Sequence, residues 1–156
     1  GKTPARYLVE AIECMDLSNA TAVDVLRDHG ATACTDVTGF GLAGHAAEMV
    51  RASGEAVTLD VPAIPRLPGA LAVLHDGVES SLQENNEQAL ADFDVHGGAP
   101  SRDDVRLLAD PQTAGGLLAS VPADAAQACI DELRDRGYPD AAIVGRVGGE
   151  RSVITL

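Results

Sequence analysis

The sequence contains no tryptophan, and aromatic residues of all kinds make up only 3% of its 156 residues. Lysine is nearly absent too: of the 11 basic residues only Lys2 is a lysine, and the others are arginines. Apolar residues nevertheless account for 46% of the chain, which is enough for a folded core. That core must be built from Ala, Val, Leu and Ile.

Long apolar runs and positive charge are also missing. No apolar run approaches the ~20 residues of a membrane-spanning helix, so we expect no membrane partner. The chain has 24 acidic against 11 basic residues, a formal net charge of −13. This charge opposes binding to nucleic acid, which we therefore do not expect as a partner. A phosphate ligand would need metal ions, or basic groups supplied from elsewhere.

Cysteine is scarce: Cys14, Cys34 and Cys129 are far apart and form no C-x-x-C pair, which argues against a disulfide framework. The chain opens without Met and without a signal peptide, which indicates a fragment, and we expect a reduced, cytoplasmic setting. Cys14 and Cys129 are expected to be small core residues. Cys34 is expected to pack inside a buried strand and not to act as a nucleophile.

Apolar periodicity and turn residues predict an alternation of helices and strands. A second helix should begin after a cap at Ser18 or Asn19 and end at Gly30. The polar segment 76–101 should be the most mobile part, because it has little apolar area to bury. Predicted helices cover 4–15, 19–29, 39–52, 67–74, 83–93 and 122–136, and 102–109 is expected to form a short helix or turn. Predicted strands cover 31–35, 57–61, 117–121, 141–147 and 152–156.

This order predicts an α+β fold (layered α/β), with two strand–helix–strand units in one mixed β-sheet packed by helices. Right-handed crossovers should place both crossover helices on one face, and the first two helices should cover the other face or an edge. The last two strands should pair as a hairpin across Gly148-Gly149. We see no domain boundary and treat 1–156 as a single domain.

A glycine-rich stretch follows the first predicted strand: residues 34–45 read Cys-Thr-Asp-Val-Thr-Gly-Phe-Gly-Leu-Ala-Gly-His. Glycines let the backbone approach a ligand, and a helix start offers free N–H groups and partial positive charge to an anion. Asp36 supplies a hard oxygen of the kind Mg²⁺ takes alongside phosphate oxygens. The stretch could therefore hold a metal-bridged phosphate. Alternatively, Asp36 or Thr38 caps the helix and the glycines only make the turn.

A second motif lies downstream, where residues 110–118 read Asp-Pro-Gln-Thr-Ala-Gly-Gly-Leu-Leu. The two motifs, in this order and separation, resemble the signatures of selenophosphate synthetases (selenide, water dikinases). These enzymes belong to the aminoimidazole ribonucleotide synthetase-like superfamily, whose other members carry different letters at the first turn. The resemblance covers nearly the whole chain, as the C-terminal half of a two-domain enzyme whose N-terminal ATP-binding domain is absent here.

The resemblance implies a fold like the C-terminal domain of aminoimidazole ribonucleotide synthetase. It also implies an enzyme that converts ATP, selenide and water into selenophosphate, AMP and phosphate with Mg²⁺. The family's reactive Cys or selenocysteine and its essential Lys lie in the N-terminal domain, so this chain alone should be inactive. The implied partners are that N-terminal domain, a second copy in a homodimer, and the substrates ATP and selenide.

In the family, the acid of the first motif joins carboxylates of the N-terminal domain around Mg²⁺, which makes Asp36 the implied metal ligand. His45 is interpreted either as a helix-face histidine bonded to a neighbouring loop or as a catalytic group. The implied phosphate- and nucleotide-binding residues are Thr35, Thr38, Gly39 and Gly41, although the two threonines could instead only order the turn.

The second motif is either a ligand-binding turn or a structural turn that packs against the first. Its members with a possible site role are Asp110, Gln112, Thr113, Gly115 and Gly116. Ala114 stands where the family usually has Ser, so any role of that hydroxyl is lost. Asn85 or Asn86 is either a substrate contact or part of a solvated loop.

Two other functions stay open: the C-terminal domain of another enzyme of the superfamily, or a non-catalytic binding or assembly domain.

Overall fold

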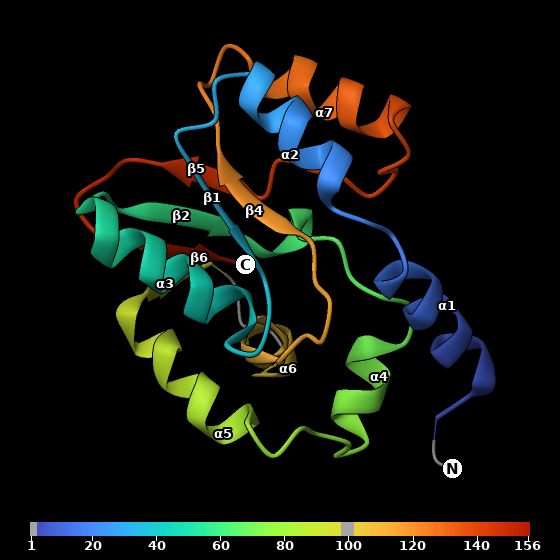
Figure 1. Cartoon of the computed structure of the whole chain (residues 1–156). Coiled ribbons are helices and arrows are strands. Elements are labelled where there is room, and N and C mark those ends of the chain that lie inside the picture. The colour runs from blue at the N-terminus through green and yellow to red at the C-terminus, as the bar shows by residue number, and fades with distance from the viewer. Residues whose placement is uncertain (1–2, 98–101) are drawn as a thin grey trace.

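The computed structural model describes residues 3–97 and 102–156, in which helices and strands alternate and the α+β class is confirmed (Figure 1). The helices are α1 (Ala5–Met15), α2 (Ala20–Asp28), α3 (Gly41–Ser53), α4 (Ala70–His75), α5 (Gln83–Asn86), α6 (Arg102–Arg106) and α7 (Ala126–Asp135). Three 3-10 turns are η1 (Val61–Ala63), η2 (Glu87–Asp92) and η3 (Leu107–Ala109). The strands are β1 (Ala33–Asp36), β2 (Val57–Asp60), β3 (Asp94–His96), β4 (Leu117–Ser120), β5 (Gly145–Val147) and β6 (Val153–Thr155).

The described strands form two sheets. β1 pairs antiparallel with β4, which places Asp36 opposite Leu117. The other sheet has the order β3-β6-β2-β5; β6 runs parallel to both of its neighbours and β5 antiparallel to β2. The predicted hairpin of 141–147 and 152–156 is wrong, because β2 lies between β5 and β6. The apolar strand β2, with Leu59 only 4% exposed, takes the central place and pairs on both edges.

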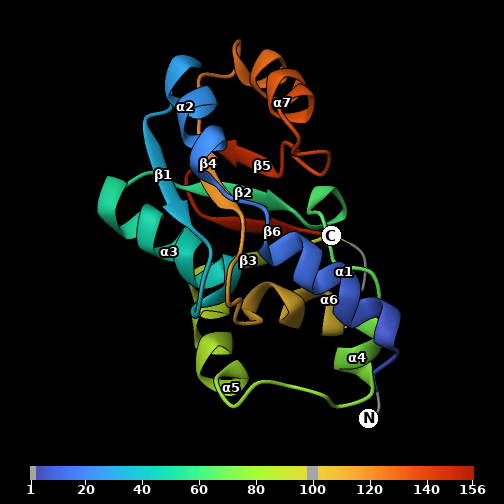
Figure 2. The same ribbon diagram turned by 45° about the vertical axis from the view of Figure 1, so that its right-hand side comes forward.

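The two strand–helix–strand units are interleaved, and do not lie side by side in one sheet as predicted. In each unit the first strand (β1 or β4) belongs to the two-stranded sheet and the second (β2 or β5) to the four-stranded sheet. The crossover helices α3 and α7 consequently do not share a face. They lie on opposite sides of the strands in both ribbon views (Figures 1 and 2).

Each crossover helix has its own apolar cluster. One cluster joins α2 and α7 over the inner side of β4, and comprises the buried residues Ala22, Val25, Leu26, Cys129 and Leu133. The other joins α3 to the four-stranded sheet, and comprises Ala43, Ala46, Ala47, Leu59, Val61, Phe93, Leu108 and Ile154. Small side chains on α3 allow its close approach to the strands, which fits a chain poor in aromatics.

Helix α1 is amphipathic as predicted, but its apolar side is not covered within the described chain. No residue of α1 is buried, and its large apolar side chains are exposed: Leu8, Val9, Ile12 and Met15. Cys14 is exposed as well, so its assignment to the core was wrong, whereas Cys129 is buried as expected. No helix in the described ranges is long and apolar enough to cross a bilayer.

The described part of segment 76–101 buries more than the sequence suggested. Gln83 is 1% and Phe93 is 6% exposed, and β3 adds an unpredicted edge strand to the larger sheet. Residues 98–101 lie outside the described residues. Phe93 therefore contradicts the expectation that this segment has little apolar area to bury, while the mobility of the segment stays a prediction.

Phe93→Ala should lower the free energy of unfolding by about 3–5 kcal/mol, because it empties a filled core position. Leu82→Ala, at a site 47% exposed in the same segment, is the matched control and should change it by less than about 0.5 kcal/mol. Urea unfolding of both variants measures the difference. Equal, small effects would show that this segment is only loosely attached.

Candidate functional site

Asp36 stands at the end of β1 with an exposed side chain. Within the ranges 3–97 and 102–156, its carboxylate has no hydrogen bond or ion pair. Helix α3 starts at Gly41, its N-cap position is Phe40, and no side chain caps it. Neither Asp36 nor Thr38 caps the helix, so the capping alternative is wrong. The Asp36 carboxylate is left available to a ligand.

The first turn, residues 36–41, depends on glycine at its last position. Gly41 has φ 68°, and a Cβ atom there would lie 2.7 Å from the carbonyl carbon of Ala109. Gly39, in contrast, is surrounded by open space, since a Cβ atom at that position would meet nothing within 4 Å. Glycine is thus required at position 41 by its left-handed backbone and by the neighbouring chain.

The second turn, residues 110–116, packs directly on the first through the backbone. The N–H of Val37 donates to Gly116 O at 2.9 Å, and the N–H of Gln112 donates to Thr38 O at 3.0 Å. A Cβ atom on Gly115 would overlap the carbonyl oxygen of Val37. The second motif therefore forms a structural turn that packs against the first, which was one of its two predicted roles. Its Gln112 and Thr113 side chains remain exposed.

Two asparagines hold the turns from either side. Asn19 sits at the N-cap position of α2, but its amide donates to Gly115 O at 3.0 Å. Asn86 donates to Gly39 O at 2.8 Å and to Ala109 O at 3.0 Å, and so ties the first turn to the chain that leads into the second. Asn86 is therefore neither a solvated loop residue nor free to bind a substrate through its NH₂ group. No sequence pattern marked these two asparagines as contacts of the turns.

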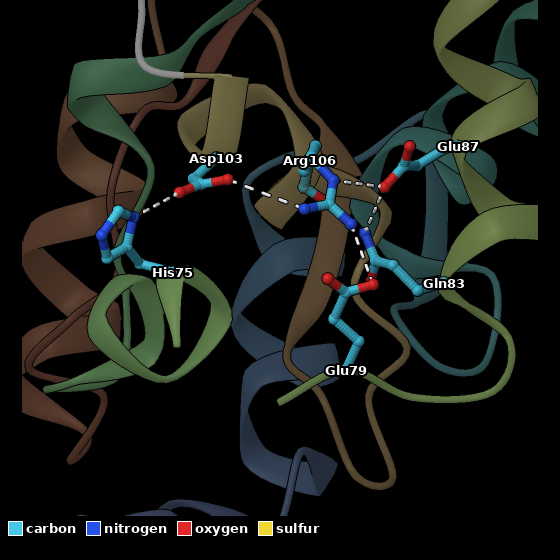
Figure 3. A network of polar contacts seen from close by, with 6 residues as sticks. All are labelled: His75, Glu79, Gln83, Glu87, Asp103 and Arg106. Atoms are coloured by element: carbon cyan, nitrogen blue, oxygen red, sulfur yellow. Dashed lines mark hydrogen bonds and ion pairs between the residues drawn. The ribbon is translucent and has the colours of Figure 1, made fainter. Parts of the chain in front are cut away.

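A charged network anchors the segment that carries Asn86 (Figure 3). Arg106 contacts Glu87 at 2.6 Å and Glu79 at 2.9 Å, and Gln83 donates to both Glu87 and Arg106 O. The hydrogen bonds that the Arg106 guanidinium donates to Glu87, and then those to Glu79, raise its pKa. Asp103 lies between Arg106 and His75. The network fixes α5 and η2 against α6, and so places Asn86 over the turns.

His45 lies on α3 beneath the first turn and is 6% exposed. Its Nε2 lies 3.2 Å from Thr38 Oγ1, and its Nδ1 lies 3.2 Å from Glu48 Oε2 without a well-directed hydrogen bond. The ring of Phe40 covers it at a centroid distance of 5.5 Å. His45 is thus a helix-face histidine bonded to a neighbouring loop, as one of the two interpretations predicted, and Thr38 is the bonded residue.

Cys34 lies on the same side of β1 as Asp36 and is exposed, contrary to the expected buried position. Cys34 pairs with Ala119 and Asp36 with Leu117, so alternation places the two residues on the face of the two-stranded sheet whose β4 side chains pack against α2 and α7. Partial burial, and then the charge of Asp36, raise the pKa of the Cys34 thiol. A raised pKa leaves less thiolate, which agrees with the expectation that Cys34 is not a nucleophile.

The remaining predicted residues are distributed along the two turns. The Thr35 hydroxyl donates to Asp36 O at 3.3 Å, so it orders the end of the strand. Asp110 is half-buried, and burial raises the pKa of its carboxyl group. No group of three or more His, Cys, Asp or Glu side chains in the described ranges is arranged to hold a metal ion. A cation bound at Asp36 would thus need ligands from outside these residues.

Gly115→Ala should destabilise the chain by about 1–3 kcal/mol, because the added methyl group meets the Val37 carbonyl and forces the two turns apart. Gly116→Ala is the matched control, since a Cβ atom there meets nothing within 4 Å. Thermal unfolding and amide exchange at Val37 and Gln112 measure the effect. If both variants behave alike, the turns are not held by this contact.

Asp110→Asn should stabilise the chain at neutral pH. Burial raises the folded-state pKa, so the unfolded chain releases this proton at lower pH, and stability falls as pH rises between the two values. Asparagine removes that fall, and below both pKa values the difference should vanish. Melting temperatures from about pH 3 to pH 8 measure it, with the exposed Asp124→Asn as control. An Asp110→Asn variant less stable than wild type at pH 7 contradicts this account.

Comparison with known proteins matches residues 9–156 to the family model described as AIR synthase related protein, C-terminal domain. The chain is similar to selenide, water dikinase of Geobacter metallireducens, 39% identical over 137 residues that cover 87% of this chain and 39% of the relative. It is also similar to the enzymes of that name from Porphyromonas gingivalis (38% identity; 86% and 38% covered) and Rhizobium meliloti (39% identity; 87% and 39% covered).

The chain thus spans about two fifths of the length of the curated relatives it matches. The resemblance read from the two motifs is confirmed by these matches. On the match over nearly all of its length, the chain belongs to the family of AIR synthase related proteins, in the part described as their C-terminal domain.

Proposed function

We propose that this chain is the C-terminal domain of a selenide, water dikinase, and that Asp36 is one of the enzyme's Mg²⁺ ligands. The reaction would convert ATP, selenide and water into selenophosphate, AMP and phosphate. The names of the relatives and the two turn motifs support this activity. The observation that carries the assignment of Asp36 is its exposed carboxylate at a strand end, beside a glycine turn and without a partner in the part of the chain that the structure describes.

The residues present fit a hard cation. Asp36 offers carboxylate oxygens, which Mg²⁺ prefers, and the backbone of Ala109 lies close to Gly41 at the end of the first turn. Mg²⁺, when bound, would neutralise charge on the phosphates during phosphoryl transfer. Asp36 would hold the Mg²⁺ ion in place, and Gly39 leaves room for a phosphate close to the backbone.

The charge distribution explains why this chain would need a metal and a second domain. Six arginines are already engaged in ion pairs with acidic side chains: Arg27, Arg51, Arg66, Arg106, Arg136 and Arg151. With a net charge of −13, the chain by itself repels phosphate groups. We therefore propose that an N-terminal ATP-binding domain completes the site, in a cytoplasmic homodimer, with further carboxylates and the catalytic lysine.

Asp36→Asn in the two-domain enzyme should lower selenide-dependent formation of AMP by about 100-fold or more, because a charged metal ligand is lost. The melting temperature without metal should hardly change, since Asp36 caps no helix. The exposed Asp124→Asn is the control and should keep wild-type turnover. Normal turnover of Asp36→Asn at limiting Mg²⁺ removes Asp36 from the mechanism, and a wild-type enzyme without selenide-dependent AMP formation removes the proposed reaction.

A further inference from the structure

We infer that the outer side of α1 is the surface on which the N-terminal domain of the two-domain enzyme docks. This surface, called the α1 patch below, consists of four exposed apolar side chains: Leu8, Val9, Ile12 and Met15. The inference rests on the proposed function and deepens it, because it names the surface that joins this chain to the domain that completes the site.

The two sides of α1 differ in what they contact. The inner side rests on the start of α4, where a Cβ atom on Gly69 would overlap the ring of Tyr7. Residues three and four apart lie on one side of a helix, which aligns Leu8, Ile12 and Met15 along the outer side. Both ribbon views show α1 beside α4 at the edge of the molecule (Figures 1 and 2). The apolar stripe of this helix is therefore turned away from the described chain.

A helix of this length needs cover on its apolar side. Isolated helices shorter than ~12–15 residues are marginal in water, and most helices in proteins are stabilised by packing of an apolar face. Helix α1 has 11 residues and none of them is buried. Single exposed apolar side chains are ordinary, whereas several on one face of one element mark an interaction surface. The α1 patch thus suits a permanent neighbour better than a transient partner.

The N-terminal domain is the occupant that the lengths and the charge favour. This chain matches only about two fifths of its relatives, and the matched part is described as a C-terminal domain, so the rest of the relatives precedes it. The family match begins within α1, at residue 9. A domain joined to the chain next to the α1 patch is present there at high effective concentration. A second copy fits less well, since two chains of net charge −13 repel each other.

The connection between α1 and α2 links the α1 patch to the candidate site. In this connection, the Tyr138 hydroxyl donates to Ser18 O at 2.6 Å, and the Asn19 amide donates to Gly115 O at 3.0 Å. Gly115 belongs to the second turn, which packs on the first. A domain seated on the α1 patch is thereby held in a fixed place relative to both turns, and so relative to Asp36.

Amide hydrogen exchange of α1, compared between the 156-residue chain and the two-domain enzyme, tests the docking. The α1 amides should exchange at least about tenfold more slowly in the two-domain enzyme, because the docked domain holds the helix in place. Helix α7 is the internal reference and should exchange equally in both proteins, since its Cys129 and Leu133 are already buried. Equal exchange of α1 in the two proteins overturns the inference.

Ile12→Gln in the two-domain enzyme should speed α1 exchange about tenfold, because docking would bury an amide group in place of an apolar one. Glutamine is a good helix former, so in the 156-residue chain the same variant should exchange as the wild type does. An equal effect of Ile12→Gln in the 156-residue chain shows that the α1 patch is covered without the N-terminal domain, and overturns the inference.

Val23→Gln is the matched control, because Val23 on α2 is 46% exposed and Ile12 is 45% exposed. This variant should leave α1 exchange unchanged in both proteins. If Val23→Gln loosens α1 as much as Ile12→Gln does, the effect does not come from the α1 patch and the inference is wrong.

The outcomes separate the docking from the function on which it rests. Selenide-dependent AMP formation by a two-domain enzyme whose α1 is unprotected leaves the function standing and overturns the docking. Slow α1 exchange in a two-domain enzyme that forms no AMP with selenide supports the docking and contradicts the reaction. Sedimentation of the 156-residue chain should show a monomer. A dimer that Ile12→Gln dissociates would identify a second copy as the cover and overturn the inference.

Discussion

The backbone contact between the two glycine turns is the constraint on which the site depends. Val37 and Gln112 each give an N–H group to the opposite turn, and Gly115 leaves no space between them. Such a contact is incompatible with a side chain at the interface, so the second motif is needed to shape the first. A structural role and a ligand role are therefore not exclusive: by holding Thr38 O, the second turn sets the backbone that follows Asp36.

The sequence predicted those parts of the fold that local rules determine. Helix ends at Gly30 and Gly54 were readable because both take positive φ, which glycine allows at low cost. The pairing of β5 and β6 was not, since adjacency in sequence favours a hairpin and nothing local shows that β2 lies between them. The contacts of Asn86 with the turns were missed for the same reason: its two acceptors are 47 and 23 residues away along the chain.

Each of the two turns carries one carboxylate that has no arginine partner among the described residues, Asp36 in the first turn and Asp110 in the second. Some other acidic side chains do pair with arginines, as Asp92 does with Arg51 at 2.8 Å. The two carboxylates differ in their surroundings, because Asp36 is exposed and Asp110 is half-buried. The motif predicted Asp36 as a ligand, whereas the environment of Asp110 emerged only from its burial, which raises the pKa of its carboxyl group.

The interleaved strands also govern the order in which the molecule can form. Every strand pairing in the described chain uses a strand from its last 40 residues: β1 waits for β4, β2 for β5 and β6, and β3 for β6. During synthesis, the first 116 residues can form helices but no sheet. The nascent chain therefore holds unpaired strand edges until these last 40 residues emerge from the ribosome, and closure of these distant contacts is expected to make folding slow for a domain of this size.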